Sequence, residues 1–234
     1  MKLLFFFSSV LMISLSAYAD VLLEDDFSDG NADGWRETEY GQCNYEVKEG
    51  EYWINGMDDS WGLSTTGDSS GTMSVPDYSL VLRVEPEYCG YAGPVVRYAG
   101  VNNYFACLLI MPQSNMVYLA DLNLSSGSHV LDYCSFTIDP EESYWMRLEV
   151  EGTQFRGRVW TGTPGDEPTE WMVSGTDNWV SDTGGIGIYC WSVSPVDEPL
   201  KSLSVYFDDV QVTGDLAGAM EPVTWGGLKV VLSD

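Results

Sequence analysis

Two groups of acidic side chains have the spacing of ligands for a divalent cation. In the first group, Asp29, Asn31 and Asp33 alternate along the chain and are followed by Gly34, as in the first half of an EF-hand calcium loop. The twelfth position of such a loop should be a bidentate Glu, but it is Tyr40 here. Asp, Asn and Gly also form ordinary turns, so a turn without a metal is the alternative.

The second acidic group is the pair Asp208-Asp209. Apolar residues alternate up to Phe207 and then shift by one position, which predicts a β-bulge at the pair. If the first and last strands are neighbours, Asp25 or Asp26 would face this pair, and a Ca²⁺ ion would offset the repulsion between the carboxylates. Solvated carboxylates at strand ends are the alternative. The candidate ligands of a structural calcium ion are Asp26, Asp29, Asp33, Asp208 and Asp209.

Aromatic side chains offer a second kind of site, because sugars are bound by flat rings beside a few fixed polar groups. Several of the nine Trp residues are flanked by polar or turn residues, namely Trp61, Trp171, Trp179 and Trp191. Polar and aromatic residues also surround one predicted turn at residues 97–104. The candidate ligand-binding residues are Arg97, Tyr98, Asn103 and Trp191.

No arrangement of residues predicts catalysis. His129 is the single His, so a Ser-His-Asp or Cys-His mechanism would depend on it alone. No CxxC pair is present, which argues against a zinc site. Glu149 and Glu151 share one face of a predicted strand, but they precede a turn at Gly152. We expect a protein that is not an enzyme, and a glycan-cleaving hydrolase with an unrecognised acid pair is an alternative.

The N-terminal segment predicts export. Lys2 precedes an apolar stretch at residues 3–15, and Ala17-Tyr18-Ala19 before Asp20 has the pattern of a cleavage site. The apolar stretch is too short to span a bilayer comfortably. We expect residues 1–19 to be a signal peptide and the mature chain to be secreted, with an extracellular, periplasmic or cell-surface location and no membrane insertion.

The charge of the chain limits its partners. The formal net charge is −26, from 36 acidic and 10 basic residues. Nucleic-acid binding is excluded, because Lys and Arg supply the attraction to phosphate. The same excess would attract divalent cations, and adaptation to a saline habitat is the alternative explanation.

Five cysteines are present, at positions 43, 89, 107, 134 and 190. An oxidising compartment allows two disulfides and one remaining thiol, and the spacing does not choose among the pairings. Cys107 lies in the apolar run YFACLLI, so we expect it to be a small buried hydrophobic residue.

The elements that must position these residues are short strands separated by turns. Strands are predicted at 21–27, 43–48, 51–55, 78–85, 93–99, 103–110, 116–122, 129–138, 144–151, 154–161, 185–192 and 202–213. No segment has a helical period. Trp35, Trp145 and Trp160 are expected in the core. The pattern predicts one all-β domain over residues 20–214 and a C-terminal tail over 215–234.

Five stretches, in order along the chain, carry a family resemblance. They are EDDFSDG (24–30) with DGW (33–35), VVRY (95–98) with NNYF (102–105), YWMRLEVEG (144–152), GGIGIY (184–189) and FDDVQV (207–212). In these stretches the chain resembles the concanavalin A-like, laminin G-like domains of secreted bacterial proteins. The resemblance implies a two-sheet antiparallel jelly-roll β-sandwich, often a carbohydrate-binding or adhesive module and sometimes one that holds calcium. It also points to Arg97 and Asn103 as site residues.

These observations together predict a secreted, non-catalytic carbohydrate-binding or adhesive β-sandwich module, with calcium as its candidate stabilising ion. Its partner would be an extracellular glycan or another cell-surface component. A structural domain of an envelope or matrix protein is the alternative from a different class. Because one fold hosts both lectins and hydrolases, the site has to decide between them.

Overall fold

The computed structural model describes residues 19–57, 59–66, 73, 75–140, 142–180, 183–192 and 203–215. The expected signal peptide and C-terminal tail therefore lie outside the described residues, except for Ala19 and Asp215. Within these described ranges, no helix is long and apolar enough to cross a membrane.

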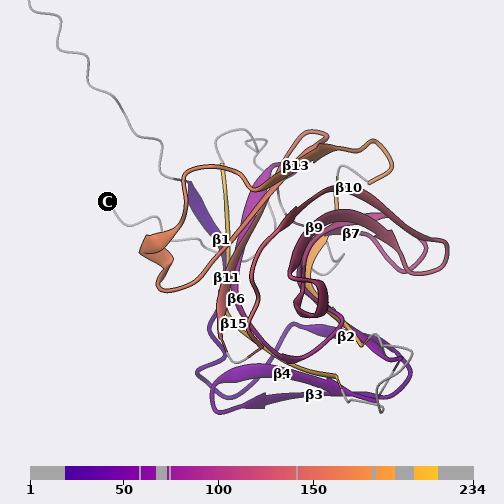
Figure 1. Cartoon of the computed structure of the whole chain (residues 1–234), viewed down its shortest axis with the longest axis vertical. Helices are drawn as coiled ribbons and strands as arrows, with labels where there is room; N and C mark the ends of the chain where they lie inside the picture. Colours follow the sequence, from indigo (N-terminus) through magenta and orange to yellow (C-terminus); the bar gives the residue numbers. More distant parts are fainter. Residues whose placement is uncertain are drawn as a thin grey trace, which may run out of the picture.

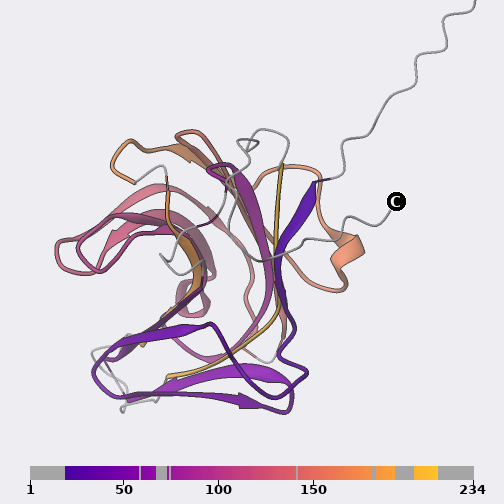
Figure 2. The ribbon, with the colours of Figure 1, turned by 180° about the vertical axis from the view of Figure 1, so that it is seen from behind.

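Two antiparallel sheets pack face to face, as Figures 1 and 2 show from opposite sides. The eight-stranded sheet contains β1 (Asp20–Asp25), β3 (Cys43–Lys48), β4 (Glu51–Gly56), β6 (Tyr78–Tyr88), β11 (Tyr144–Glu151), β12 (Gln154–Trp160), β13 (Val173–Thr176) and β15 (Leu203–Gly214). Its order is β13-β12-β11-β6-β15-β4-β3, with β1 paired to β15.

The seven-stranded sheet contains β2 (Arg36–Tyr40), β5 (Trp61–Thr66), β7 (Tyr91–Tyr98), β8 (Phe105–Met111), β9 (Met116–Asn123), β10 (Gly127–Ser135) and β14 (Gly185–Trp191). Its order is β10-β9-β8-β7-β14-β5-β2. This sheet is curved, and its hollow side faces away from the eight-stranded sheet (Figure 1). Two short 3₁₀ helices, η1 (Pro112–Ser114) and η2 (Pro164–Asp166), lie in connections.

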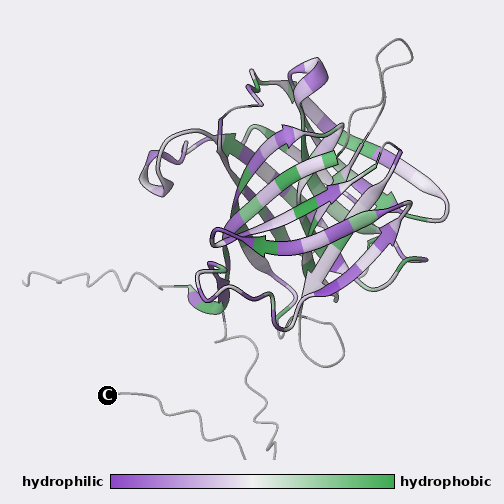
Figure 3. Ribbon diagram, turned by 90° about the horizontal axis from the view of Figure 1, so that it is seen from below, coloured by the Kyte–Doolittle hydropathy of each residue, from purple (hydrophilic) through white to green (hydrophobic). Residues whose placement is uncertain are grey.

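The core lies between the sheets and is built from alternate residues of each strand, the pattern expected of half-buried strands. Leu80 and Leu82 of β6 pair with Leu148 and Met146 of β11, and all four side chains are fully buried. Figure 3 shows the resulting alternation of hydrophobic and hydrophilic bands along the strands. The all-β jelly-roll prediction is therefore confirmed.

All twelve predicted strands are present, and three strands were not predicted. β2 carries charged residues on both faces, and β13 has only four residues. β5 contains Gly62, where a Cβ atom would lie 2.8 Å from a methyl carbon of Ile54 in the opposite sheet. Glycine breaks the strand pattern in the sequence at this position, yet it is what lets the two sheets approach.

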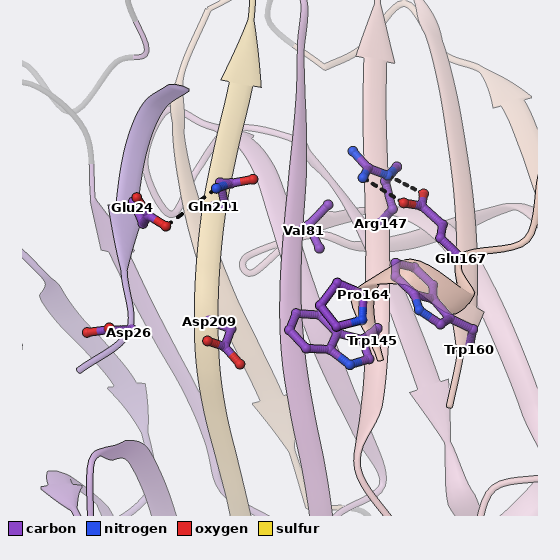
Figure 4. A pocket seen from close by; sticks show the side chains of 10 residues that line it. All are labelled: Glu24, Asp26, Val81, Trp145, Arg147, Trp160, Pro164, Glu167, Asp209 and Gln211. Atoms are coloured by element: carbon purple, nitrogen blue, oxygen red, sulfur yellow. Dashed lines mark hydrogen bonds and ion pairs between the residues drawn. The ribbon is translucent and has the colours of Figure 1, made fainter. Parts of the chain in front are cut away.

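The predicted bulge in the last strand is confirmed. The pairing of β15 with β6 shifts between Asp208 and Gln211, and Asp209 has a positive φ of 50°. Before the bulge β15 pairs with β4, and after it β15 pairs with β1. The first and last strands are therefore neighbours, which places Asp26 and Asp209 on the same part of the sheet (Figure 4).

Candidate functional site

Seven aromatic side chains follow one another across the outer face of the seven-stranded sheet. Strand pairing joins Tyr40 to Trp61, Trp61 to Trp191, and Trp191 to Tyr91. The series continues with Tyr118 of β9, which pairs with Tyr133 of β10. With Tyr189, whose ring lies 6.3 Å from Trp61, these residues form what we call the aromatic line.

Ring contacts show that the aromatic line is nearly continuous. The centroid distances are 6.3 Å for Tyr40–Trp61, 5.8 Å for Tyr91–Trp191, 6.1 Å for Tyr91–Tyr118 and 6.0 Å for Tyr118–Tyr133. The two ends are the most open, with Tyr40 60% and Tyr133 61% exposed. The rings between them are half-buried, except for the buried Tyr189. Burial raises the pKa of Tyr189, so its hydroxyl stays protonated at neutral pH.

A second apolar cluster supports the aromatic line. It contains Leu63, Val95, Phe105, Cys107 and Leu109, which are buried although they belong to the outer face of the sheet. An antiparallel sheet that faces water on one side normally presents polar residues there. This sheet therefore carries apolar residues on both faces, and the partly exposed rings of the aromatic line lie over the outer apolar cluster.

The strands of this sheet carry four carboxylates, and all of them turn away from the aromatic line. Glu37 and Glu39 of β2 accept hydrogen bonds from the Tyr52 hydroxyl and the Cys43 backbone of the opposite sheet. Asp121 of β9 is fully buried, and Asp132 of β10 accepts from the backbone of Ser174 in β13. Within the described strands, the outer face therefore carries no carboxylate, in a chain with 36 acidic residues.

The predicted ligand-binding residues are divided among three places. Trp191 belongs to the aromatic line, and Tyr98 packs against the apolar cluster beneath it. Asn103 lies in the exposed turn before β8, where its amide donates to the Ala99 carbonyl at 2.8 Å. Sequence reasoning missed most of the aromatic line, because it could not tell which strand faces share one side of the sheet.

Arg97 does not reach the aromatic line. Its side chain is 1% exposed, and it donates to the carbonyls of Gly152 at 2.6 Å and Pro76 at 2.9 Å. The pairing of β7 with β14 shifts between Gly185 and Gly187, and Arg97 has a positive φ of 57°. This bulge turns Arg97 inward, so we assign it a structural role in place of the predicted role in ligand binding.

In the first acidic group, side chains bond to the local backbone. Asp29 and Asn31 accept hydrogen bonds from the backbone amides two residues ahead of each, and Asp26, which precedes the group, does the same. The backbone amide of Asp33 is the donor to Asn31. These contacts are Asx turns, which corresponds to the turn alternative of the sequence analysis.

In the second acidic group, an arginine pairs with the carboxylates. Arg83 of β6 forms ion pairs with Asp208, with Asp209 at 3.3 Å, and with Glu51 at 2.8 Å. Burial raises the pKa of Asp208, although hydrogen bonds from Asp209 and Arg83 oppose that shift. One guanidinium therefore offsets part of the repulsion between Asp208 and Asp209 that motivated a calcium ion.

Within the described residues, no group of three or more His, Cys, Asp or Glu side chains is placed to hold a metal ion. Asp26 and Asp209 do line a cavity of about 310 Å³ on the outer face of the eight-stranded sheet (Figure 4). Arg147 on the cavity wall bonds to Glu167 through two nitrogens. Calcium stays a prediction.

Trp145 and Trp160 are buried, as expected of core residues, but they lie outside the main cluster between the sheets. They line the same cavity, and the loop around η2 covers them by accepting their indole N–H groups at the carbonyls of Gly162 and Thr163. Trp35 packs against the core as predicted.

All five cysteines are free thiols in the structure. The two disulfides that an oxidising compartment would allow are therefore not formed in it. Cys107 is fully buried in the outer apolar cluster, as expected. Burial also raises the pKa of its thiol.

Comparison with known proteins rests on structure alone, because no family model and no curated protein matches the chain. The carbohydrate-binding module CBM66 from Bacillus subtilis is 16% identical, covers 77% of this chain and 96% of its own, and has a TM-score of 0.57. A laminarinase from Flavobacterium sp. UMI-01 is 10% identical over 83% of this chain and 100% of its own, with a TM-score of 0.57. A prokaryotic β-1,3-1,4-glucanase (lichenase) derived from a mouse hindgut metagenome is 14% identical over 82% of this chain and 98% of its own, with a TM-score of 0.56.

These similarities establish the fold. The chain is a concanavalin A-like jelly roll, as the sequence resemblance implied, and it shares this architecture with both a binding module and glycanases. At such low identity, the choice between binding and catalysis depends on the residues of this chain.

Proposed function

We propose that this chain is a non-catalytic carbohydrate-binding module whose aromatic line binds a glycan chain. The observation that carries the proposal is the line itself, in which six strands contribute rings to one face. Neighbouring strands lie about 4.8 Å apart, so a sheet of seven strands spans roughly 29 Å, which is long enough for several sugar units. Half-buried rings held by neighbouring rings are pre-organised for stacking and lose little entropy on binding.

The lack of carboxylates on the described outer face supports binding over hydrolysis. Glycosidases use two carboxyl groups about 5–10 Å apart, on either side of the bond they cleave. On this sheet the four carboxylates bond on the opposite side or are buried. A glycan on the aromatic line would therefore meet rings and apolar side chains but no acid pair.

Affinity electrophoresis tests this proposal. The mature chain would be run through gels containing laminarin, β-1,3-1,4-glucan or xylan, because enzymes that share the fold over all or part of their chains are named for these polymers. We expect retardation by at least one polymer, and a loss of at least about tenfold in affinity for Trp61→Ala and for Trp191→Ala, since aromatic hot spots contribute about 2 kcal/mol or more.

Tyr206→Ala is the matched control, because Tyr206 stacks on Trp53 at 5.9 Å on the opposite sheet. Its retardation should equal that of the wild type. If the wild type is retarded by none of the polymers, or if both Trp variants are retarded like the control, the aromatic line is not the binding site. Release of reducing sugar by the purified protein would contradict the non-catalytic part of the proposal.

We also propose that the protein is exported, on the basis of its N-terminal segment. The test is N-terminal sequencing of the mature protein after expression with the full N-terminal segment. We expect the sequence to start at Asp20, and an intact Met1 on the soluble protein would contradict export by this route.

A further inference from the structure

A second cluster of rings lies apart from the aromatic line. Tyr104 before β8, His129 of β10 and Trp179 after β13 come from three different segments, and we call them the end cluster. Tyr104 packs against the core between the sheets, whereas five of the seven rings of the aromatic line belong to the outer apolar cluster or pack against it. The end cluster is therefore a separate surface.

The three rings of the end cluster are in mutual contact. The imidazole of His129 lies 4.3 Å from the indole of Trp179, edge to face at 72°, and 5.7 Å from Tyr104, nearly parallel at 23°. Tyr104 and Trp179 are 5.3 Å apart. Trp179 is nevertheless 59% exposed, so much of its indole surface stays open to solvent.

Hydrogen bonds hold the backbone that carries the exposed indole. The Asp177 carboxylate accepts hydrogen bonds from the backbone amides of Trp179 at 2.5 Å and Val180 at 2.9 Å. Val180 is buried and forms a parallel bridge with Tyr104. An exposed ring on a rigid segment can contact a ligand without a large loss of conformational entropy.

A buried carboxylate orients His129. Asp121 has no exposed surface, and it accepts from the His129 backbone at 2.8 Å while contacting Nδ1 of the ring at 3.0 Å. The contact at Nδ1 leaves Nε2 as the ring nitrogen available to a ligand. The side chain of His129 is 45% exposed, so part of the ring is open to a ligand beside the indole.

We propose that the end cluster is a second ligand site, which takes a single sugar ring of a glycan. The apolar face of the ring would stack on Trp179, and a hydroxyl would hydrogen-bond to Nε2 of His129. Small-molecule sites combine apolar and aromatic side chains with a few placed polar groups, and the end cluster offers three rings, one of which carries such a group. The proposal depends on the proposed function only for the choice of a glycan as the ligand.

Fluorine NMR separates the two sites. The mature protein would be labelled with 5-fluorotryptophan, and the signals of Trp61, Trp179 and Trp191 assigned by substituting Phe at each position. Oligosaccharides of β-1,3-glucan, β-1,3-1,4-glucan and β-1,4-xylan would then be titrated. We expect the Trp179 signal to move with saturation, also in a Trp61→Ala, Trp191→Ala double variant.

Two variants test the role of His129. His129→Ala should raise the saturating concentration at Trp179 at least tenfold. His129→Gln is the second variant, for the case that His129→Ala does not fold. Its amide can still donate to Asp121 and so keeps the buried carboxylate paired. It lacks the ring, so it should also weaken binding. Tyr206→Ala should leave the titration unchanged.

The possible results distinguish this proposal from the previous one. If Trp61 and Trp191 respond while Trp179 does not, the end cluster is no sugar site and the aromatic line stands. If the Trp179 response disappears in the double variant, the end cluster is not a separate site. If no signal moves with any of the glycans, both proposals are wrong.

Discussion

Arg97 provides a sharp test of the structure, because its predicted role and its observed role lead to opposite results. Its guanidinium donates to the carbonyls of Gly152 and Pro76 at 2.6 and 2.9 Å, lies 3.5 Å from Asp77, and packs over Phe155 at 5.6 Å. Arg97→Ala removes these contacts and leaves a cavity beside two unpaired carbonyls. We expect a loss of roughly 3–5 kcal/mol in the free energy of unfolding.

The assay is urea denaturation of the mature protein, with the midpoint compared at constant slope. For a domain of this size, such a loss corresponds to a melting temperature lower by roughly 6–20 °C. Arg97→Lys keeps the charge but cannot bond both carbonyls in the same way. Its free energy of unfolding should therefore lie between those of the wild type and Arg97→Ala. Its affinity for any retained glycan should equal that of the wild type.

Arg36→Ala is the matched control. Arg36 is exposed on β2, and it forms no ion pair within the part of the chain that the structure describes, so we expect a change below about 0.5 kcal/mol. A loss under about 1 kcal/mol for Arg97→Ala would refute the structural role. A folded Arg97→Lys protein that no longer binds glycan would restore the predicted role in ligand binding.

Two further predictions concern pH and calcium. Burial raises the pKa of the Cys43 thiol to about 11, and it also raises the pKa values of the Tyr52 and Tyr78 hydroxyls. In the unfolded chain these pKa values are about 8.5 for Cys and 10 for Tyr, so the folded values are higher. The stability that these neutral groups contribute is fully present below the unfolded pKa values and is lost as pH rises past them. The urea midpoints at pH 7, 9 and 10.5 should therefore fall in that order. Equal midpoints would contradict this prediction. Millimolar calcium against chelator at fixed ionic strength should raise the melting temperature of the wild type but not of the Asp208→Ala, Asp209→Ala variant, and equal melts in both conditions for the wild type would end the calcium prediction.

Much of the fold could be predicted because strands with one buried face have a local signature. Leu80, Leu82 and Val84 alternate with polar neighbours, and such alternation identifies a strand and its buried face without knowledge of its partners. The bulge at Asp208-Asp209 was also visible as a change of parity. β2 and β5 were not predicted, since charged residues on both faces and Gly62 remove that signature.

The candidate site could be predicted only in part. Trp191 was named because of its residue type, and it does belong to the aromatic line. Arg97 was named for its type as well, but the bulge in β7 turns it into the interior. Strict alternation from Val95 would have placed Arg97 on the outer face and Tyr98 inside, whereas the structure has the reverse.

The sequence by itself determined the β class of this protein, most of its strands and its acidic character, because these follow from composition and from periods of two residues along the chain. Only the tertiary structure decided which rings share a face. Tyr40, Trp61, Trp191 and Tyr91 come from segments far apart in the chain, and they are brought into line by hydrogen-bonded register between strands. Register depends on long-range pairing and on bulges, and neither is encoded in the local pattern of any one strand.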